Sequence, residues 1–209
     1  MKRPIRTPKK PQARTLATKA RILDAALEVF TEFGFEKANL DLVAEQAGCS
    51  RGAIYAHYAS KEEVFLGLRD HRLRAQIVAI CARLEEIPDL EKRRATFKRW
   101  VVGQIADPFW GILMLEYKLH AVRHPEAREK LLSHYESFSS QSPSGLIELL
   151  FGKNLSKSAR AAIQRRMAVL GSTFSGLVLE SRFRPDLFPS GKIEPFADEI
   201  FEVLIRPQP

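Results

Sequence analysis

The chain of 209 residues is 45% hydrophobic and 28% charged, which is typical of a globular protein and excludes a fibrous or wholly disordered chain. It has no apolar run of membrane-spanning length, no apolar segment behind its basic N-terminus and only two cysteines, so we expect no membrane insertion, no signal peptide, no disulfide framework and a cytoplasmic location. The formal net charge of +8 favours an anionic partner, and residues 1–74 hold 14 Lys and Arg against 9 Asp and Glu.

The first 14 residues contain six Lys or Arg, three prolines and no acidic residue, which predicts a disordered basic arm over 1–14. Such an arm lies along phosphates or in a minor groove in some DNA-binding proteins, and in others it only keeps the chain soluble. Both interpretations stay open at this point.

Helical spacing of apolar residues begins at Thr15, and Gly34 is expected to end this first helix. A shorter helix follows over 40–47, with Asn39 placed as its N-cap. Together with the next short helix, these segments predict a small helical domain over 15–68.

The link between the second and third helices has the pattern of a helix-turn-helix. Ala44 is small where the two helices would cross, and Gly48 suits the positive φ of the turn. Ser50 is expected to cap a third helix over 51–58, and Ile54 would face the interior. Any tight helix pair could use this arrangement, so the outer face of the third helix must decide its function.

That outer face carries side chains suited to DNA. Arg51 lies in the first turn, where an arginine can donate a bidentate pair of hydrogen bonds to guanine O6 and N7. Gly52 and Ala53 are small enough to let the backbone approach a groove floor. Tyr55 and His57 can donate to phosphates, although an aromatic side chain at Tyr55 could instead be part of the core.

Ser60 and Glu63 form a capping box that opens a long helix over 60–83. Lys61 then opposes the helix macrodipole at the N-terminus. A bound phosphate would explain this placement, and so would simple compensation by the neighbouring glutamates. Tyr58, in contrast, is expected to be a core aromatic.

The remainder of the chain is also helical in pattern, without convincing strands, so we expect an all-α fold with a larger bundle over 69–209. Pro143 should break or kink the third of its helices, because proline removes a helical hydrogen bond. The expected helices span 90–106, 109–123, 125–151, 157–181 and 193–205.

The run "ARILDAALEVFTEFGFEKANLDLVAEQAGCSRGAIYAHYASKEEVFLGL", residues 20–68, closely resembles the N-terminal domain of the TetR (tetracycline-repressor-like) family. The resemblance covers about a quarter of the chain. It implies base reading by Arg51, Gly52 and Ala53, and phosphate contacts by Asn39, Tyr55, His57 and Lys61. Two departures stand out: Ala38 replaces a frequent threonine, and Cys49 replaces a usual valine as a small apolar residue of the turn.

The resemblance also implies that the C-terminal helices form a homodimer interface. Small residues beside large ones in 157–181 permit close helix packing, which supports this independently, although ordinary intramolecular packing would use the same pattern. The expected interface residues are Leu170, Phe174, Leu177, Val178, Phe196, Ile200, Phe201 and Leu204.

The middle helices hold aromatic and polarisable side chains that either line an apolar effector pocket or belong to the core. The candidate pocket residues are Trp100, Trp110, Met114, Glu116, Tyr117, His120 and Phe138. His120 and His124 have the spacing of a metal-ligand pair, but without further ligands we expect two surface histidines and no metal.

The resemblance, together with these patterns, implies a dimeric DNA-binding transcriptional regulator, with repression as its expected mode of action, released from a palindromic double-stranded operator by a small, largely apolar or aromatic effector. The alternative is the same DNA-binding domain controlled by a protein partner. We expect no cofactor, no membrane partner and no enzymatic activity, because the sequence has no Gly-rich phosphate loop, nucleophile elbow or convincing metal set.

Overall fold

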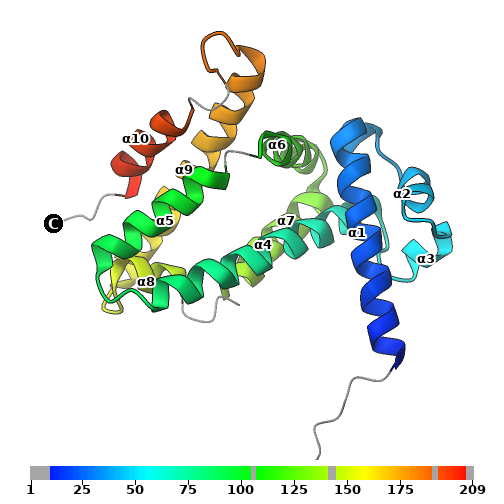
Figure 1. The fold of residues 1–209 in the computed structure, drawn as a ribbon, viewed down its shortest axis with the longest axis horizontal. Coiled ribbons are helices and arrows are strands. Elements are labelled where there is room, and N and C mark those ends of the chain that lie inside the picture. The colour runs from blue at the N-terminus through cyan, green and yellow to red at the C-terminus, as the bar shows by residue number, and fades with distance from the viewer. Residues whose placement is uncertain (1–9, 105–106, 141–144, 190–192, 206–209) are drawn as a thin grey trace, which may run out of the picture. The chain divides into compact units, whose positions relative to one another are not determined.

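The computed structural model describes residues 10–104, 107–140, 145–189 and 193–205. The described residues form helices and no strand, which confirms the expected all-α fold. Figure 1 labels the helices as α1 (Lys10–Lys37), α2 (Leu40–Gln46), α3 (Arg51–Tyr55), α4 (Lys61–Glu85), α5 (Leu90–Gln104), α6 (Pro108–Arg123), α7 (Pro125–Ser140), α8 (Leu146–Phe151), α9 (Lys157–Phe183) and α10 (Glu194–Ile205). Along the chain they divide into two compact units, Met1–Arg72 and Leu73–Pro209.

The first unit is built around three phenylalanines from α1 and α4. The ring centroids of Phe30, Phe35 and Phe65 lie 5.3–5.8 Å apart, and all three side chains are buried. Phe65 meets the other two rings edge to face, and Phe30 and Phe35 are stacked. Aromatic packing of these kinds adds to the free energy gained by burying apolar area. This cluster holds α1 against the start of α4, while α2 packs on α1 and α3 packs on α2.

Helix α1 differs from the sequence prediction at its start. It begins at Lys10, so residues 10–14 are helical and not part of a disordered arm, while residues 1–9 lie outside the described residues. Pro11 does not oppose this, because the N–H that proline lacks has no helical partner in a first turn. Gly34 interrupts the helical geometry with φ 72°, ψ 167°, which confirms it as the end of the regular helix.

The second unit keeps the predicted helices with one division. The segment predicted as a single helix over 125–151 forms α7 and α8, and Pro143 itself lies outside the described residues. The core of this unit is shared by the end of α4 and by α5, α8, α9 and α10. Its buried residues are Ile80, Cys81, Leu84, Phe97, Leu149, Leu150, Leu170, Phe174, Val178, Ile193, Ala197, Phe201 and Ile205.

Polar contacts fasten the same helices to one another. Lys98 on α5 reaches Asp198 and Glu202 on α10, at 3.1 and 2.7 Å, and these contacts raise the pKa of its ammonium group. Arg93 and Arg94 on α5 donate to the carbonyl oxygens of Leu149 and Leu150 near the end of α8. Cations at a helix C-terminus complement the helix dipole there.

Helices α6 and α9 approach closely at Gly111. A Cβ atom at this position would lie 2.9 Å from Cγ1 of Val178. Glycine therefore sets how near the two helices pack. Within the described ranges, no helix has the combination of length and apolar character that crossing a membrane would need.

Candidate DNA-binding surface

The corner between α2 and α3 has the geometry of a helix-turn-helix. Gly48 adopts φ 58°, and its amide donates to the carbonyl oxygen of Glu45 (3.0 Å). Cys49 donates to Ala44 (3.0 Å). A left-handed residue directly after a helix satisfies its last carbonyl groups and turns the chain sharply. The predicted role of Gly48 in the turn is confirmed.

Helix α3 is short, with a capped N-terminus and one buried side. The hydroxyl of Ser50 accepts a hydrogen bond from the amide of Ala53 (3.2 Å), which confirms Ser50 as its N-cap. Ile54 is fully buried, together with Val43 and Ala47 of the preceding segment. Because Ile54 fixes the inner side of the helix, the opposite side must face outwards. The helix ends at Tyr55, three residues earlier than predicted.

The exposed side of α3 carries the residues expected there. Arg51, Gly52, Tyr55 and Ala56 are exposed, and Ala53 is half-buried. Gly52 has open space around it, since an added Cβ would meet only the Ser50 hydroxyl, at 3.8 Å. The result is a low surface of small side chains flanked by one arginine and one tyrosine, a shape that fits a major groove.

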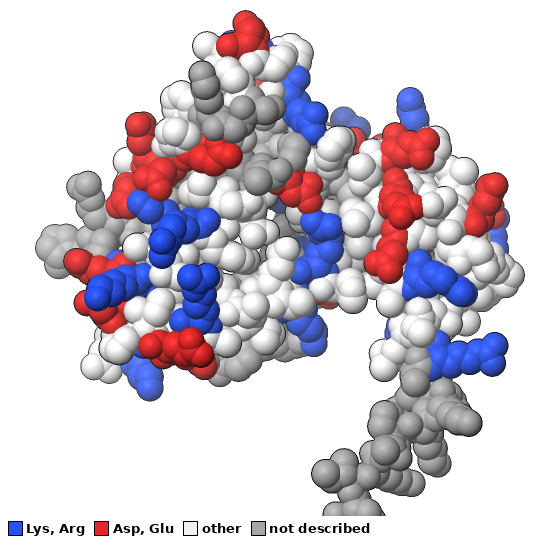
Figure 2. Space-filling model, viewed as in Figure 1, with Lys and Arg blue, Asp and Glu red and all other residues white. Residues whose placement is uncertain are grey.

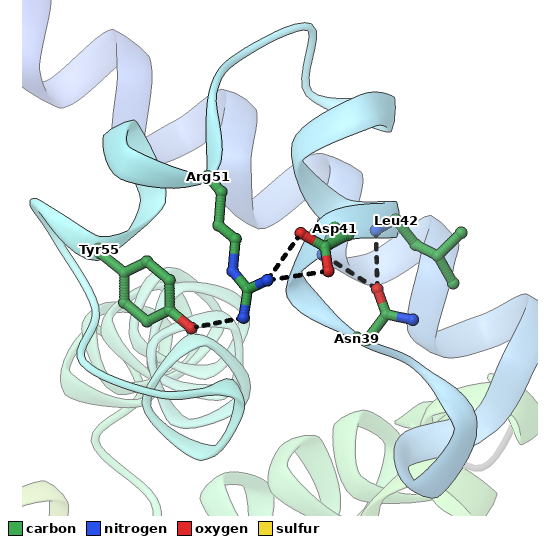
Figure 3. Close-up of polar contacts among 5 residues, drawn as sticks. All are labelled: Asn39, Asp41, Leu42, Arg51 and Tyr55. Atoms are coloured by element: carbon green, nitrogen blue, oxygen red, sulfur yellow. Dashed lines mark hydrogen bonds and ion pairs between the residues drawn. The ribbon is translucent and has the colours of Figure 1, made fainter.

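Arg51 is held by a chain of polar contacts that crosses the corner (Figure 3). Its Nη1 donates to both carboxylate oxygens of Asp41 at 3.1 Å, and its Nη2 donates to the Tyr55 hydroxyl at 3.2 Å. The guanidinium also lies 5.5 Å from the centroid of the Tyr55 ring. The hydrogen bond to Tyr55 and the charge of Asp41 raise the pKa of Arg51 above its ordinary value.

Asn39 continues this chain at the start of α2. Its Oδ1 accepts hydrogen bonds from the amides of Asp41 and Leu42, both at 3.0 Å, which confirms the predicted N-cap. The side-chain oxygen is therefore occupied, and the Nδ2 group is the part of Asn39 suited to donate to a phosphate. Ala38 beside it is buried, so it offers no contact of its own.

Tyr58 and His57 are both half-buried. The Tyr58 ring packs on Gly67, where an added Cβ would lie 2.8 Å from Cε1, and the Lys19 ammonium lies 6.0 Å from the ring centroid. Burial raises the pKa of the Tyr58 hydroxyl. The expectation that Tyr58 is a packing residue is confirmed.

Lys61 makes contacts within the protein that the sequence did not predict. Its ammonium donates to the carbonyl oxygens of Phe35 (2.7 Å) and Glu36 (3.0 Å) and lies 4.6 Å from the centroid of the Phe35 ring. These carbonyls belong to the C-terminal end of α1, where a positive charge is favourable. A cation at the start of α4 is thus explained without DNA, and a phosphate contact of Lys61 stays a prediction.

The capping box at α4 is confirmed with a shift of one residue. The Ser60 hydroxyl accepts from the amide of Glu63 (3.3 Å), and the Glu63 carboxylate accepts from the amide of Ala59 (2.9 Å) instead of that of Ser60. Both bonds satisfy amides that a helix N-terminus leaves without intrahelical partners. They fix the turn that joins α3 to α4.

Charge by itself does not mark this surface. On the face drawn in Figure 2, described Lys and Arg side chains and described Asp and Glu side chains are both present, and the basic ones do not merge into one large area. The case for DNA binding therefore rests on the geometry of α2 and α3 and not on the net charge.

The predicted effector residues fall into two groups. Trp100 lies on α5 and stacks on Phe97, with ring centroids 5.6 Å apart, at the edge of the second unit's core. The others whose side chains are described lie on α6: Tyr117 is fully buried, and Trp110, Met114, Glu116 and His120 are half-buried. The Phe138 side chain lies outside the described residues. The rings of His120 and His124 stack with centroids 4.2 Å apart.

Four of the predicted dimer residues belong to the core of the unit itself. Leu170, Phe174, Val178 and Phe201 have at most 8% of their surface exposed. They therefore offer little surface to a partner subunit, and their part in a dimer interface stays a prediction. Leu177, Ile200 and Leu204 are half-buried, and Phe196 is exposed.

The opposite face of α9, together with part of α10, is apolar and exposed. Ser172 and Gly176 lie on this α9 face, and an added Cβ at Gly176 would meet nothing within 4 Å. The Ser172 hydroxyl donates to the Ala168 carbonyl (3.0 Å), so it presents little unmet polarity. The large exposed apolar residues of these two helices are Val169, Leu179, Phe183, Phe196 and Val203, and we call this set the α9–α10 face.

Comparison with known proteins gives the same picture for the first unit. The family described as "Bacterial regulatory proteins, tetR family" matches residues 22–68. An HTH-type transcriptional regulator of Pseudomonas putida, TtgW, is 46% identical over 68 residues, which are 31% of this chain and 51% of that protein. The chain spans about half or less of the length of the curated relatives it matches first.

Solved structures match nearly the whole chain at the level of the fold. The fatty acid degradation regulator FadR from Bacillus halodurans has a TM-score of 0.67 at 21% identity, over 96% of this chain and 97% of that one. The regulator FadR from Bacillus subtilis in complex with stearoyl-CoA has a TM-score of 0.62 at 20% identity, over 90% and 97%. Both units therefore have counterparts in one known fold.

Proposed function

Since residues 22–68 match the family of bacterial regulatory proteins described as tetR, we propose that the chain is a DNA-binding transcriptional regulator that acts as a homodimer. The observation that carries the proposal is the orientation of α3. Ile54 turns inwards while Arg51, Gly52 and Tyr55 face outwards, on a corner fixed by Gly48. A helix so presented places its first turn against base edges in a major groove.

Specific and unspecific contacts would divide among the candidate residues of this surface. Arg51 would read a guanine, with Gly52 and Ala53 allowing the close approach. Asn39, Tyr55, His57 and Lys61 would contact phosphates and so set register and affinity. Asn39 has its Nδ2 group for this purpose, because its oxygen is used in capping α2.

The α9–α10 face supports the homodimer. It is exposed and apolar, with Ser172 and Gly176 small enough for helices of two subunits to approach closely. A two-fold axis through such a face would pair two copies of the first unit. Two recognition helices related by this axis would read a palindromic operator, one half-site each.

The regulator would respond to a small, largely apolar or aromatic effector in the second unit. Support comes from half-buried Trp110 and Met114 beside polar Glu116 and His120 on α6. One protein of the same fold, FadR from Bacillus subtilis, has been solved in complex with stearoyl-CoA, a molecule with a long apolar chain. The alternative, control by a protein partner, would use the same DNA-binding unit.

Helix α4 supports a link between effector and DNA. It runs unbroken from Lys61 to Glu85, and the boundary between the two units falls within it, after Arg72. An effector changes DNA affinity only if it binds the DNA-competent state and the released state differently. We propose that the effector favours the released state, so that the free protein represses transcription. No catalytic step is part of this proposal.

Selection from a random duplex library with the purified full chain tests the function. The expected result is one palindromic sequence enriched over several rounds, bound by two subunits. A protein that selects no sequence at low salt contradicts the proposal. On the selected site, aromatic compounds and acyl-CoA thioesters are then titrated; release by one of them supports the effector, and no response to any supports the protein-partner alternative.

A further inference from the structure

An acidic residue lies at the centre of the DNA-facing corner. Asp41 is exposed in the first turn of α2, and its backbone amide is fixed by the Asn39 cap. Its carboxylate accepts from Arg51 Nη1 through both oxygens at 3.1 Å. A negative charge facing DNA repels phosphates, so its position against the base-reading arginine requires an explanation beyond its favourable place in the helix dipole.

The contact constrains the arginine from both sides. Asp41 belongs to α2 and Tyr55 to the end of α3, and they hold Nη1 and Nη2 respectively (Figure 3). The Nε–H group takes part in neither contact. Because the guanidinium is planar, fixing Nη1 and Nη2 also fixes the direction of the Nε–H bond. An arginine has five N–H donors, so a guanidinium held in this way keeps donors for a base.

Holding a long side chain in place changes recognition. A free arginine loses the rotamer entropy of its long side chain when it is fixed. If part of that ordering exists before DNA binds, less is lost on binding, and fewer wrong bases are reached by alternative rotamers. Both effects sharpen discrimination at the base pair that the arginine contacts.

Building on the proposed function, we propose that Asp41 is a specificity-determining residue that acts by positioning Arg51 for base readout. It gives up some affinity for DNA in general, through its charge, and gains discrimination at one base pair in each half-site. Tyr55 holds the other side of the Arg51 guanidinium from α3. Its hydroxyl therefore has two roles, one in positioning Arg51 and one in contacting a phosphate.

The test compares Asp41→Asn with wild type in the full-length protein. On the selected operator and its single-base variants, Asp41→Asn should lose about two- to fivefold of discrimination at the Arg51-dependent base pair, the range of a surface ion pair. Its affinity for unrelated duplexes should rise. Glu45→Gln is the matched control, because Glu45 is an exposed acid one turn further along α2, and it should keep the wild-type base preference.

A double-mutant cycle separates positioning from a structural role. If Asp41 acts through Arg51, Asp41→Asn should change no base preference in the Arg51→Ala background. A direct readout without DNA is the NMR relaxation of the Arg51 Nε–H group, which should show more motion in Asp41→Asn than in wild type and Glu45→Gln.

The outcomes distinguish this inference from the proposed function. Sequence-selective binding by wild type, with unchanged preference and unchanged Arg51 motion in Asp41→Asn, overturns the role of Asp41 and leaves the function standing. Wild type that selects no sequence overturns both. A loss of discrimination that persists in the Arg51→Ala background also overturns the positioning role, because Asp41 would then act independently of Arg51.

Discussion

The ammonium nitrogen of Lys61 lies 2.7 Å from the carbonyl oxygen of Phe35, a residue 26 positions earlier in the chain. This bond, with a second to Glu36, joins the first residue of α4 to the end of α1. Lys61, which is expected to contact DNA, therefore also stabilises the unit that carries the recognition helix.

Replacing Lys61 by methionine should therefore lower the stability of the protein even without DNA. Methionine keeps much of the apolar stem and removes both hydrogen bonds, so we expect a loss of about 1–2 kcal/mol in the free energy of unfolding. Urea denaturation measures it. Lys37→Met, at an exposed lysine in the last turn of α1, is the control and should cost less.

The same variant tests the predicted phosphate contact. If the remaining ammonium donor meets a phosphate, the slope of log affinity against log salt concentration should fall by about one per subunit. Reduced stability with an unchanged slope would restrict Lys61 to its structural role.

Arg51→Ala should reduce base discrimination at one position per half-site by about tenfold to a hundredfold, because a bidentate contact with guanine is lost. Binding to a panel of operator variants measures it. Arg21→Ala removes the same charge from an exposed position on α1 and should leave the ranking of operators unchanged. Equal rankings for wild type and Arg51→Ala would refute base reading by Arg51.

Two glycines of the corner should respond differently to alanine. Gly48→Ala should cost about 1 kcal/mol, since φ 58° strains any residue with a Cβ although no atom lies within 4 Å. Gly52→Ala, in ordinary helical geometry with open space, should leave the thermal midpoint unchanged or slightly raised. It should nevertheless weaken DNA binding, because its methyl group stands on the exposed side of α3. Equal midpoints for the two variants would contradict this account of the turn.

Gly111→Ala should force α6 and α9 apart. The new Cβ would lie 2.9 Å from a methyl of Val178, and overpacking of this kind costs about 1–3 kcal/mol. Val178→Ala removes that methyl, so the double variant should be more stable than the sum of the two single losses predicts. Strictly additive losses in denaturant titrations would show that the contact does not limit the packing.

The proposed dimer face is tested by two exposed valines of nearly equal exposure. Val203 on α10 is 76% exposed and Val122 on α6 is 77% exposed, so glutamate at either site should leave the subunit folded. Val203→Glu should shift the protein to monomers in sedimentation, because an unpaired carboxylate would be buried between subunits. Val122→Glu should stay dimeric. The reverse pattern would move the interface to α6.

The local structure of this protein could be predicted from its sequence. Capping and turn formation are local interactions, so they can be predicted from neighbours within a few positions. This holds for the caps Asn39 and Ser50, for the turn at Gly48 and for the inward side chain of Ile54 on α3. The exposed face of α3 follows from the same periodicity.

Which residues each helix face contacts could not be predicted in the same way, because these contacts come from helix packing. Helix α9 has apolar residues on two faces, and periodicity groups Leu170 with Phe174 without saying that they form the core while Val169 and Leu179 face outwards. Likewise, the residues that flank Lys61 and Asp41 in the sequence do not indicate that Lys61 contacts Phe35 or that Asp41 contacts Arg51. These contacts depend on how separate helices pack, and packing is set by the sum of many distant contacts that no single stretch of sequence contains.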